Sequence, residues 1–342
     1  MSRNVKIASF VIGVFLLVSL SFYTYQMVST PNLQVQKKDK FLYIPEGADF
    51  KQVLDSLEQG QYLTDKLSFA FLSKLMGYQS DVKPGAYLIK GNMTNFAAVR
   101  ALKNGRQTPI KLTFNNLRTK QDLARQLSNK FAFGYDEILA RLNDPQVASS
   151  LGLDTNTITS IFIPNTYEVY WMTKPDALIS KMAKEYKKFW TEERKAKAKA
   201  LGMTQTEVSV LASIVECETK KKDEMPIVAR VYKNRLDRHE KLQADPTVVF
   251  AVGDFSIKRV LYGHKNTDSP YNTYMYQGLP PGPIYLASST AIDAVLNMPM
   301  HSYIFFCARP DFSGYHDFAV DYAAHLVNAK RYQAALDAAN IH

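Results

Sequence analysis

The sequence predicts an α+β protein that one N-terminal helix holds in a membrane. Three observations support this prediction. Residues 7–27 form an apolar run without a charge, short strand-like runs alternate with helically spaced apolar residues from Lys40 onward, and a capping signal at Thr204 opens an apolar helix.

The composition is typical of a folded protein with an anionic partner. Hydrophobic residues make up 46% of the 342 residues and charged residues 22%, which excludes a disordered or coiled-coil chain. Two cysteines exclude a disulfide framework and a cysteine-rich zinc module, so packing must hold the core. The net charge of +10 indicates nucleic acid, a membrane surface or an acidic polymer as the partner.

The N-terminal segment is divided into a cytoplasmic tail over 1–6, a transmembrane helix over 7–27 and a stalk over 28–39. A helix over 7–27 is about 30 Å long, enough to cross a bilayer core. Arg3 and Lys6 precede it, so we expect the N-terminus in the cytoplasm and the rest of the chain beyond the cell (inner) membrane. An exported body argues against nucleic acid as the partner. The alternative is a cleaved signal peptide, although no A-x-A-like site follows the run.

Residues 40–108 are expected to form a compact α+β subdomain. Strand-like runs occur at 41–44 and 86–89, and apolar residues at helical spacing lie between them. Thr94 is expected to cap a further helix that ends near Gly105.

Residues 109–203 are expected to form a second α+β and largely helical region. A strand over 110–114 and the helix after it repeat the opening of the preceding subdomain, 70 residues further along. The repeat aligns Ile44 with Phe114, Val53 with Leu123 and Leu57 with Leu127. A charged helix over 176–199 is expected to end at Gly202.

Residues 204–342 begin with the helix that carries the candidate catalytic acid. Thr204 and Glu207 have the spacing of a capping box, and the run VLASIV that follows is apolar nearly all round, which indicates a buried helix. Glu216 comes directly after this run. Burial there raises the pKa of a carboxyl group and keeps it protonated, as a general acid requires.

Another role for Glu216 stays open at this point, and Glu218 competes with it. Glu216 could instead form a salt bridge to Arg230 or Arg235 on the next helix. Glu218 is about 200° further around the helix, so the two cannot share a face. We expect Glu218 to face solvent or to pair with Lys221 or the lysine after it.

Polar loops after this helix predict a sugar-binding groove. Segment 243–247 is expected to be a polar turn before an apolar strand or helix over 248–252. Segments 269–274 and 277–283 are too rich in Tyr, Asn, Thr, Gly and Pro for a regular helix or a central strand, and long loops of this kind are often functional. Tyrosine rings can stack on pyranose rings, while amides and hydroxyls can bind sugar hydroxyls. The groove candidates are Gln243, Asp245, Tyr271, Asn272 and Tyr274, and Asn234 and Arg235 are further hydrogen-bonding candidates.

The sequence shows no compact metal signature, P-loop, dinucleotide fingerprint or nucleophile elbow. We therefore expect no metal and no cofactor, and neither a nucleotide enzyme nor a common serine hydrolase. Cys217 and Cys307 would form a disulfide only if the fold brought them together, and a buried free thiol is the other possibility for Cys217.

Five ordered blocks resemble the endolytic murein transglycosylase family, which is MltG/YceG-like. They are LASIVECET at 211–219, NRL at 234–236, LQADPTV at 242–248, YNTY at 271–274 and GLPPG at 278–282. The later GYHDF at 314–318 and His325 also fit. Cys217 departs from the polar or basic residue expected between the two glutamates. The resemblance covers nearly the whole chain after the N-terminal helix.

The resemblance implies a lyase of the cell wall. Such proteins cleave the β-1,4 bond between N-acetylmuramic acid and N-acetylglucosamine in nascent peptidoglycan strands, leave a 1,6-anhydro end and so terminate elongation. The first glutamate of the block, Glu216, would be the catalytic acid. Residues 40–108 would be a LysM-like subdomain and 204–342 the catalytic domain with its glutamate on a buried helix. Peptidoglycan strands would be the substrate, and peptidoglycan synthases are candidate partners.

Two other functions stay open on the sequence alone. One is a membrane-anchored peptidoglycan-binding scaffold of cell-wall synthesis without catalysis. The other is a hydrolytic muramidase, which needs a second carboxylate near the scissile bond, and Asp245 is the candidate. Hydrolysis adds a water to the product and the lytic reaction does not, so product mass separates these functions.

Overall fold

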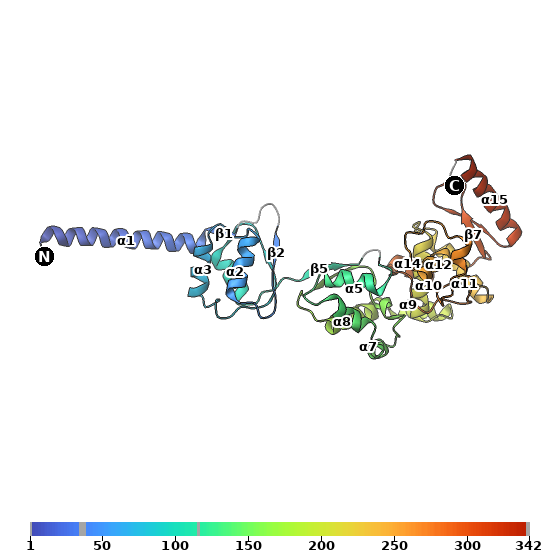
Figure 1. Cartoon of the computed structure of the whole chain (residues 1–342), viewed down its shortest axis with the longest axis horizontal. Coiled ribbons are helices and arrows are strands. Elements are labelled where there is room, and N and C mark those ends of the chain that lie inside the picture. The colour runs from blue at the N-terminus through green and yellow to red at the C-terminus, as the bar shows by residue number, and fades with distance from the viewer. Residues whose placement is uncertain (1, 34–38, 115–116, 340–342) are drawn as a thin grey trace. The chain divides into compact units, whose positions relative to one another are not determined.

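The computed structural model describes residues 2–33, 39–114 and 117–339, and the chain folds as two compact units of mixed helix and sheet. The first unit comprises Met1–Lys111 with Glu168–Thr173, and the second Leu112–Tyr167 with Lys174–His342. Figure 1 shows the order of the elements along the chain. The segments 40–108, 109–203 and 204–342 divide the chain more finely and stay predictions.

The first unit begins with the long apolar helix α1, Arg3–Ser29 (Figure 1). Its most apolar stretch of 18 residues has a mean hydropathy of 2.3 and none of it is buried, so the helix can cross a membrane by length and composition. Met27 is the buried residue of the helix. The helix extends beyond the predicted 7–27 at both ends.

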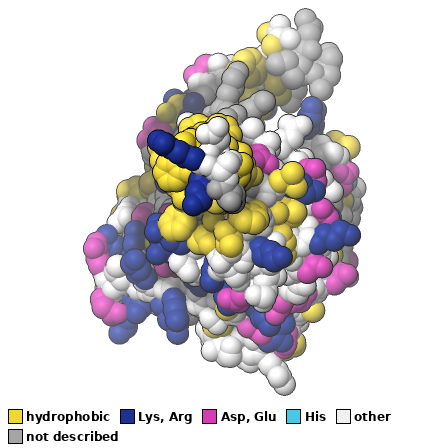
Figure 2. All heavy atoms as spheres, turned by 90° about the vertical axis from the view of Figure 1, so that its left-hand side faces the viewer, with side chains coloured by type: hydrophobic (Ala, Val, Ile, Leu, Met, Phe, Trp, Pro, Cys, Tyr) yellow, Lys and Arg dark blue, Asp and Glu magenta, His cyan; other side chains and the backbone are white. Residues whose placement is uncertain are grey.

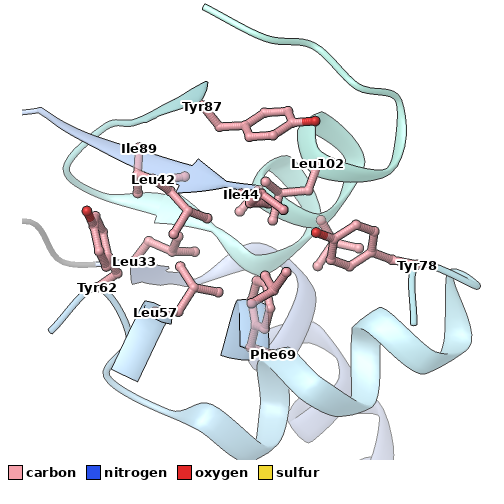
Figure 3. Packing of buried hydrophobic residues seen from close by; sticks show 13 residues of the cluster. Leu33, Leu42, Ile44, Leu57, Tyr62, Phe69, Tyr78, Tyr87, Ile89 and Leu102 are labelled. Carbon is pink, nitrogen blue, oxygen red and sulfur yellow. The ribbon is translucent and has the colours of Figure 1, made fainter. Parts of the chain in front are cut away.

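The beginning of the predicted stalk is part of the folded unit. Strand β1, Pro31–Leu33, pairs antiparallel with β4, Met93–Thr94. The side chain of Leu33 is fully buried in the core of the unit (Figure 3). Residues 34–38 of the predicted stalk lie outside the described residues.

A two-stranded sheet and three helices enclose the core of the first unit. The elements are β2 (Lys40–Ile44), α2 (Phe50–Gln59), α3 (Lys66–Leu75), β3 (Gly85–Ile89) and α4 (Asn95–Lys103). β2 and β3 pair antiparallel, with Leu42 opposite Tyr87. Leu42, Ile44 and Leu57 pack with Phe69 in this core (Figure 3). All five elements occur where the sequence predicts them, and Thr94 caps α4 as expected.

The second unit is mostly helical. Its first half contains α5 (Lys120–Ser128), α6 (Tyr135–Leu142), α7 (Pro145–Ser150), the 3-10 helix η1 (Ile158–Ile161), α8 (Pro175–Phe189) and α9 (Glu192–Ala200). The paired strands β5 (Ile110–Thr113) and β6 (Thr166–Val169) each have residues in both units. Its second half contains α10 (Gln205–Glu218), α11 (Met225–Asp237), α12 (Asp245–Val252), α13 (Tyr262–Lys265), α14 (Ser289–Leu296), β7 (Phe305–Ala308), β8 (His316–Ala319) and α15 (Tyr322–Ala338).

The predicted internal repeat is confirmed in the local structure. β2 leads into α2 and β5 leads into α5, and both helices begin with a capping box, at Asp49 and at Thr119. The aligned apolar residues are buried in both copies: Ile44, Val53 and Leu57 in the first, and Phe114, Leu123 and Leu127 in the second. Residues 115–116, within the predicted turn of the second copy, lie outside the described residues.

The prediction of one charged helix over 176–199 is wrong. The chain forms α8 and α9 instead, with a break at Trp190 and Thr191. Trp190 leaves the helical region at ψ 75 and its side chain is buried, while the Thr191 side chain accepts a hydrogen bond from the N–H of Arg194 and so caps α9. Burial of the indole therefore outweighs the helical pattern of the charged residues around it.

Leu57 and Leu67 differ in burial, so replacing each of them with Ala should change the stability of the protein to different extents. We expect Leu57→Ala, at a fully buried position, to lower the free energy of unfolding by about 2–5 kcal/mol, because it leaves a cavity. Leu67→Ala, at a position 79% exposed on α3, should change it by less than about 0.5 kcal/mol. Chemical denaturation of the full chain in detergent measures both, and equal losses would contradict the packing described.

Candidate active site

Helix α10 of the second unit carries two glutamates, Glu216 and Glu218, in its last turn. The Thr204 hydroxyl accepts a hydrogen bond from the N–H of Glu207 at 3.1 Å, and the Glu207 carboxylate accepts one from the N–H of Thr204 at 2.7 Å. This is the predicted capping box. Every residue from Val208 to Val215 is buried, as the apolar sequence predicts, and the last turn carries Glu216 and Glu218.

Glu216 joins the end of α10 to the start of α14. Its carboxylate accepts hydrogen bonds from the Ser288 hydroxyl at 2.5 Å and from the Ser288 N–H at 3.3 Å. The same serine caps α14 through the N–H of Ala291. Among the described residues neither Arg230 nor Arg235 forms an ion pair with Glu216, so the salt bridge considered from the sequence does not form.

The prediction that Glu218 faces solvent or pairs with Lys221 is wrong. Its side chain lines a pocket, and the Tyr232 hydroxyl on α11 donates a hydrogen bond of 2.5 Å to its Oε1. Burial is the main cause that raises the pKa of Glu218 to about 7, the negative charge of Asp245 adds to it, and the hydrogen bond from Tyr232 opposes it. A carboxyl group with this pKa is largely protonated at slightly acidic pH.

The pocket around Glu218 has a volume of about 280 Å³ and combines a polar with an aromatic wall. It is lined by Glu218, Val231, Tyr232, Arg235, Leu242, Gln243, Asp245, Tyr274, Ile304, Phe305, Phe306, Tyr322 and His325. These residues come from α10, α11, α12, β7, α15 and the loops between them. A few convergent polar groups on an apolar wall are typical of a ligand site.

Hydrogen bonds hold the polar wall of this pocket in place. The Tyr274 hydroxyl donates to Asp245 at 2.6 Å. The Arg235 guanidinium donates to the carbonyls of Leu242 at 2.6 Å and Ile304 at 2.8 Å, and more distantly to the Gln243 side chain at 3.4 Å. Arg235 therefore fixes the backbone on both sides of the pocket.

Three of the five predicted groove residues, Gln243, Asp245 and Tyr274, line the pocket with Glu218. The other two do not. Asn272 is fully buried and donates to the carbonyls of Lys265 and Thr267, so it holds its own loop together. The ring of Tyr271 packs against that of Phe250, with 4.7 Å between the ring centroids.

Several pocket residues were not predicted from the sequence. Tyr232 follows Glu218 by fourteen positions, Phe305 and Tyr322 lie much further along the chain, and none of the three belongs to a motif in the sequence. Asn234, a predicted hydrogen-bonding residue, donates to the carbonyls of His301 and Tyr303 instead. His325 fits the resemblance to the family, and the structure places it in the pocket wall beside Phe305.

The described residues contain no group of three or more His, Cys, Asp or Glu side chains that could hold a metal ion. Cys217 and Cys307 are both free thiols, and burial raises the pKa of Cys217 to about 11. A thiol with that pKa is protonated and a poor nucleophile at neutral pH.

Comparisons with known proteins relate this chain to cell-wall enzymes. The model of the YceG-like family matches residues 42–331. The endolytic murein transglycosylase of Bacillus subtilis (strain 168) is 26% identical over 282 residues, which are 78% of this chain and 78% of that protein. The endolytic murein transglycosylase of Streptococcus pneumoniae serotype 2 (strain D39) is 27% identical over 335 residues, and the match covers 88% of this chain and 60% of that protein.

The fold is also similar to a solved structure. The crystal structure of a yceG-like protein from Listeria monocytogenes aligns with a TM-score of 0.57 and 23% sequence identity. The alignment covers 85% of this chain and 99% of that chain. At this identity the likeness concerns the fold.

The raised pKa of Glu218 predicts a pH-dependent effect on stability. The ionised carboxylate is disfavoured in the folded state, so the fold loses stability as pH rises from the ordinary pKa of 4.5 to about 7. Glu218→Gln removes this charge and should stabilise the protein at pH 8 by up to about 3 kcal/mol before solvent screening. At pH 4.5 the gain should be small. Thermal unfolding of the full chain at both pH values measures this, and an equal effect at both would contradict the raised pKa.

Proposed function

The chain belongs to the YceG-like family, and on that premise we propose that it is a membrane-anchored endolytic murein transglycosylase, a lyase that cuts the glycan strands of peptidoglycan. The observation that carries the proposal is the pocket in which Glu218 lies with a raised pKa. Helix α1 is the candidate anchor. Arg3 and Lys6 then remain in the cytoplasm, and the site acts outside the inner membrane.

Glu218, rather than Glu216, is the general acid of this proposal. Both glutamates are in the last turn of α10, but the carboxylate of Glu216 is engaged by Ser288 in two hydrogen bonds. Glu218 lines the pocket, and its pKa of about 7 lets it hold a proton at the pH of the reaction and release it. Glu216 is then a positioning residue that fixes the end of α10.

One carboxyl group can perform both proton transfers of a lytic cleavage. Protonated Glu218 donates its proton to the β-1,4 glycosidic oxygen as the bond to C1 of N-acetylmuramic acid breaks. The C6 hydroxyl of the same sugar then attacks C1, and the carboxylate of Glu218 takes its proton. The product carries a 1,6-anhydro ring, no water is added, and Glu218 returns to its protonated form.

The pocket supplies a second carboxylate, Asp245, which the Tyr274 hydroxyl holds at 2.6 Å. Its negative charge raises the pKa of Glu218 and can stabilise positive charge that develops at C1. The same residue is what a hydrolytic muramidase would need as its second carboxylate. Hydrolysis is therefore the second candidate function, and Asp245 in the pocket is the observation that favours it.

Other parts of the chain have supporting roles in this proposal. The sheet and helices over residues 40–108 act as a LysM-like module that holds the glycan strand. Peptidoglycan synthases, which make the nascent strand, are the protein partners. The net charge of +10 suits the anionic lipids and polymers of the envelope.

The first test follows product mass on uncrosslinked glycan strands, with the full chain in detergent. We expect anhydro ends from the wild type. Glu218→Gln should lose about 100-fold or more of the activity, because the general acid is removed. Glu216→Gln should stay within about tenfold of the wild type, since the amide oxygen can still accept from Ser288.

The outcomes of this test separate the candidate functions. Reducing ends would identify a hydrolase and make Asp245 its second carboxylate. A large loss in Glu216→Gln with activity retained in Glu218→Gln would restore Glu216 as the acid. Binding of strands without cleavage by the wild type would favour a scaffold. Circular dichroism of each variant checks that it is folded.

The dependence of activity on pH gives an independent test, because two variants should shift it in opposite directions. Activity should fall as pH rises through about 7, because Glu218 loses its proton. Tyr232→Phe removes a hydrogen bond that stabilises the carboxylate, so the alkaline limb should move to higher pH. Asp245→Asn removes a negative charge, so the limb should move to lower pH. Shifts of the same sign would contradict this account of the site.

A further inference from the structure

Helix α3 has apolar side chains on its outer face as well as in the core. Phe69 and Leu72 are buried in the first unit. Leu67, Phe71 and Leu75 occur at intervals of four residues, which places them on one face of the helix. These three side chains are 79%, 52% and 65% exposed. Such a row is unusual on a water-facing helix and marks an interaction surface.

The exposed row lies beside the base of α1. α1 contacts both α3 and α4, and α4 adds Phe96, which is 39% exposed. Figure 2 looks along α1 toward this face of the unit, and hydrophobic side chains gather there around the helix. The apolar surface is therefore continuous with the helix that can cross a membrane.

A buried network of amide groups fixes α1 to this face. The Asn95 side chain on α4 donates to the carbonyl of Met27 in α1 at 3.1 Å and to the Ser68 hydroxyl on α3 at 3.0 Å. The Asn32 side chain donates to Asn95 at 2.7 Å and exchanges two hydrogen bonds of 2.7 Å with the backbone of Asp65. The end of α1 therefore holds α3 and α4 in one orientation.

The charges on these helices are all positive. The sequences of α3 and α4 contain no Asp or Glu and carry four cations, Lys66, Lys74, Arg100 and Lys103. Lys74 and Arg100 are exposed, and the Arg100 guanidinium lies 5.4 Å from the centre of the Phe96 ring. An apolar row with cations beside it is the pattern of a helix that lies in the head-group region of an anionic bilayer.

The length of α1 determines where its C-terminal end lies in a membrane. Its 27 residues are about 40 Å long, whereas the hydrocarbon core of a bilayer is about 30 Å thick. With Arg3 and Lys6 on the cytoplasmic side, residues 7–26 take up about 30 Å, so the C-terminal end of α1, with Met27, lies in the head-group region. The surface of α3 beside this end is then at the level of the lipid head groups.

We propose that Leu67, Phe71, Leu75 and Phe96 insert into the interface of the membrane that α1 crosses, and that the cations beside them bind anionic phospholipid head groups. The first unit is thereby a second, interfacial membrane contact and not only a module carried on a stalk. The proposal rests on the membrane anchoring by α1 in the function proposed above. It is independent of the chemistry of Glu218.

The test uses the full chain reconstituted in vesicles of phosphatidylglycerol and phosphatidylcholine with brominated acyl chains, which quench tryptophan on contact. Phe71→Trp reports on the outer face of α3. Tyr43→Trp is the matched control, since Tyr43 is 44% exposed and belongs to β2, the strand that Figure 1 shows on the side of the unit away from α1. Phe15→Trp, in the middle of α1, reports on the anchor. The signal of the two native tryptophans is subtracted with the wild type.

We expect the added fluorescence of Phe71→Trp and Phe15→Trp to be lost in brominated vesicles and that of Tyr43→Trp to be kept. The quenching of Phe71→Trp should weaken when phosphatidylglycerol is left out or when Lys74 and Arg100 are replaced by Gln. Quenching of Phe15→Trp without quenching of Phe71→Trp would overturn the interfacial contact, with α3 then free for a protein partner. No quenching of Phe15→Trp would overturn the anchoring itself.

Discussion

The hydrogen bonds between Ser288 and Glu216 orient the last turn of α10 in the candidate active site. They fix the rotation of α10 about its axis by tying one side of its last turn to the start of α14. A residue two positions further along a helix lies about 200° around its axis, so Glu218 must point away from the side of Glu216. That direction is toward Tyr232 on α11 and into the pocket. Two glutamates of similar sequence context thus have different surroundings, because one helix cannot turn both to the same side.

The pKa of Glu218 results from opposing contributions that come from different parts of the chain. Removal from water and the charge of Asp245 favour the protonated form, while the hydroxyl of Tyr232 favours the carboxylate. Together these contributions put the pKa of Glu218 at about 7, which suits a group that donates and then accepts a proton in the proposed reaction. Burial alone would give a higher pKa, because the hydrogen bond from Tyr232 lowers the pKa by more than the charge of Asp245 raises it.

Local features of the fold could be predicted from the sequence, and the site could be predicted only in part. The caps at Thr94 and Thr204 and the buried run before Glu216 depend on neighbours within four residues, so their patterns are visible in the sequence. The surroundings of Glu218 are built from α11, α12 and β7 to α15, far along the chain. An apolar run before a glutamate predicts a buried helix, but it does not predict which way the last turn points.

Polar loop residues also show that a sequence motif does not predict which way its side chains point. Asn272 and Tyr274 occur in one motif, but Asn272 satisfies buried backbone carbonyls and Tyr274 reaches the pocket. The amides of Asn32 and Asn95 at the base of α1 show why such residues are used. Both nitrogens donate, both oxygens accept, and no amide group is left without a partner in this network. A fully paired network holds its elements in one geometry, whereas apolar contacts alone would allow α1 to slide. Because α1 is held in this way, the depth of α1 in a membrane also sets the depth of α3.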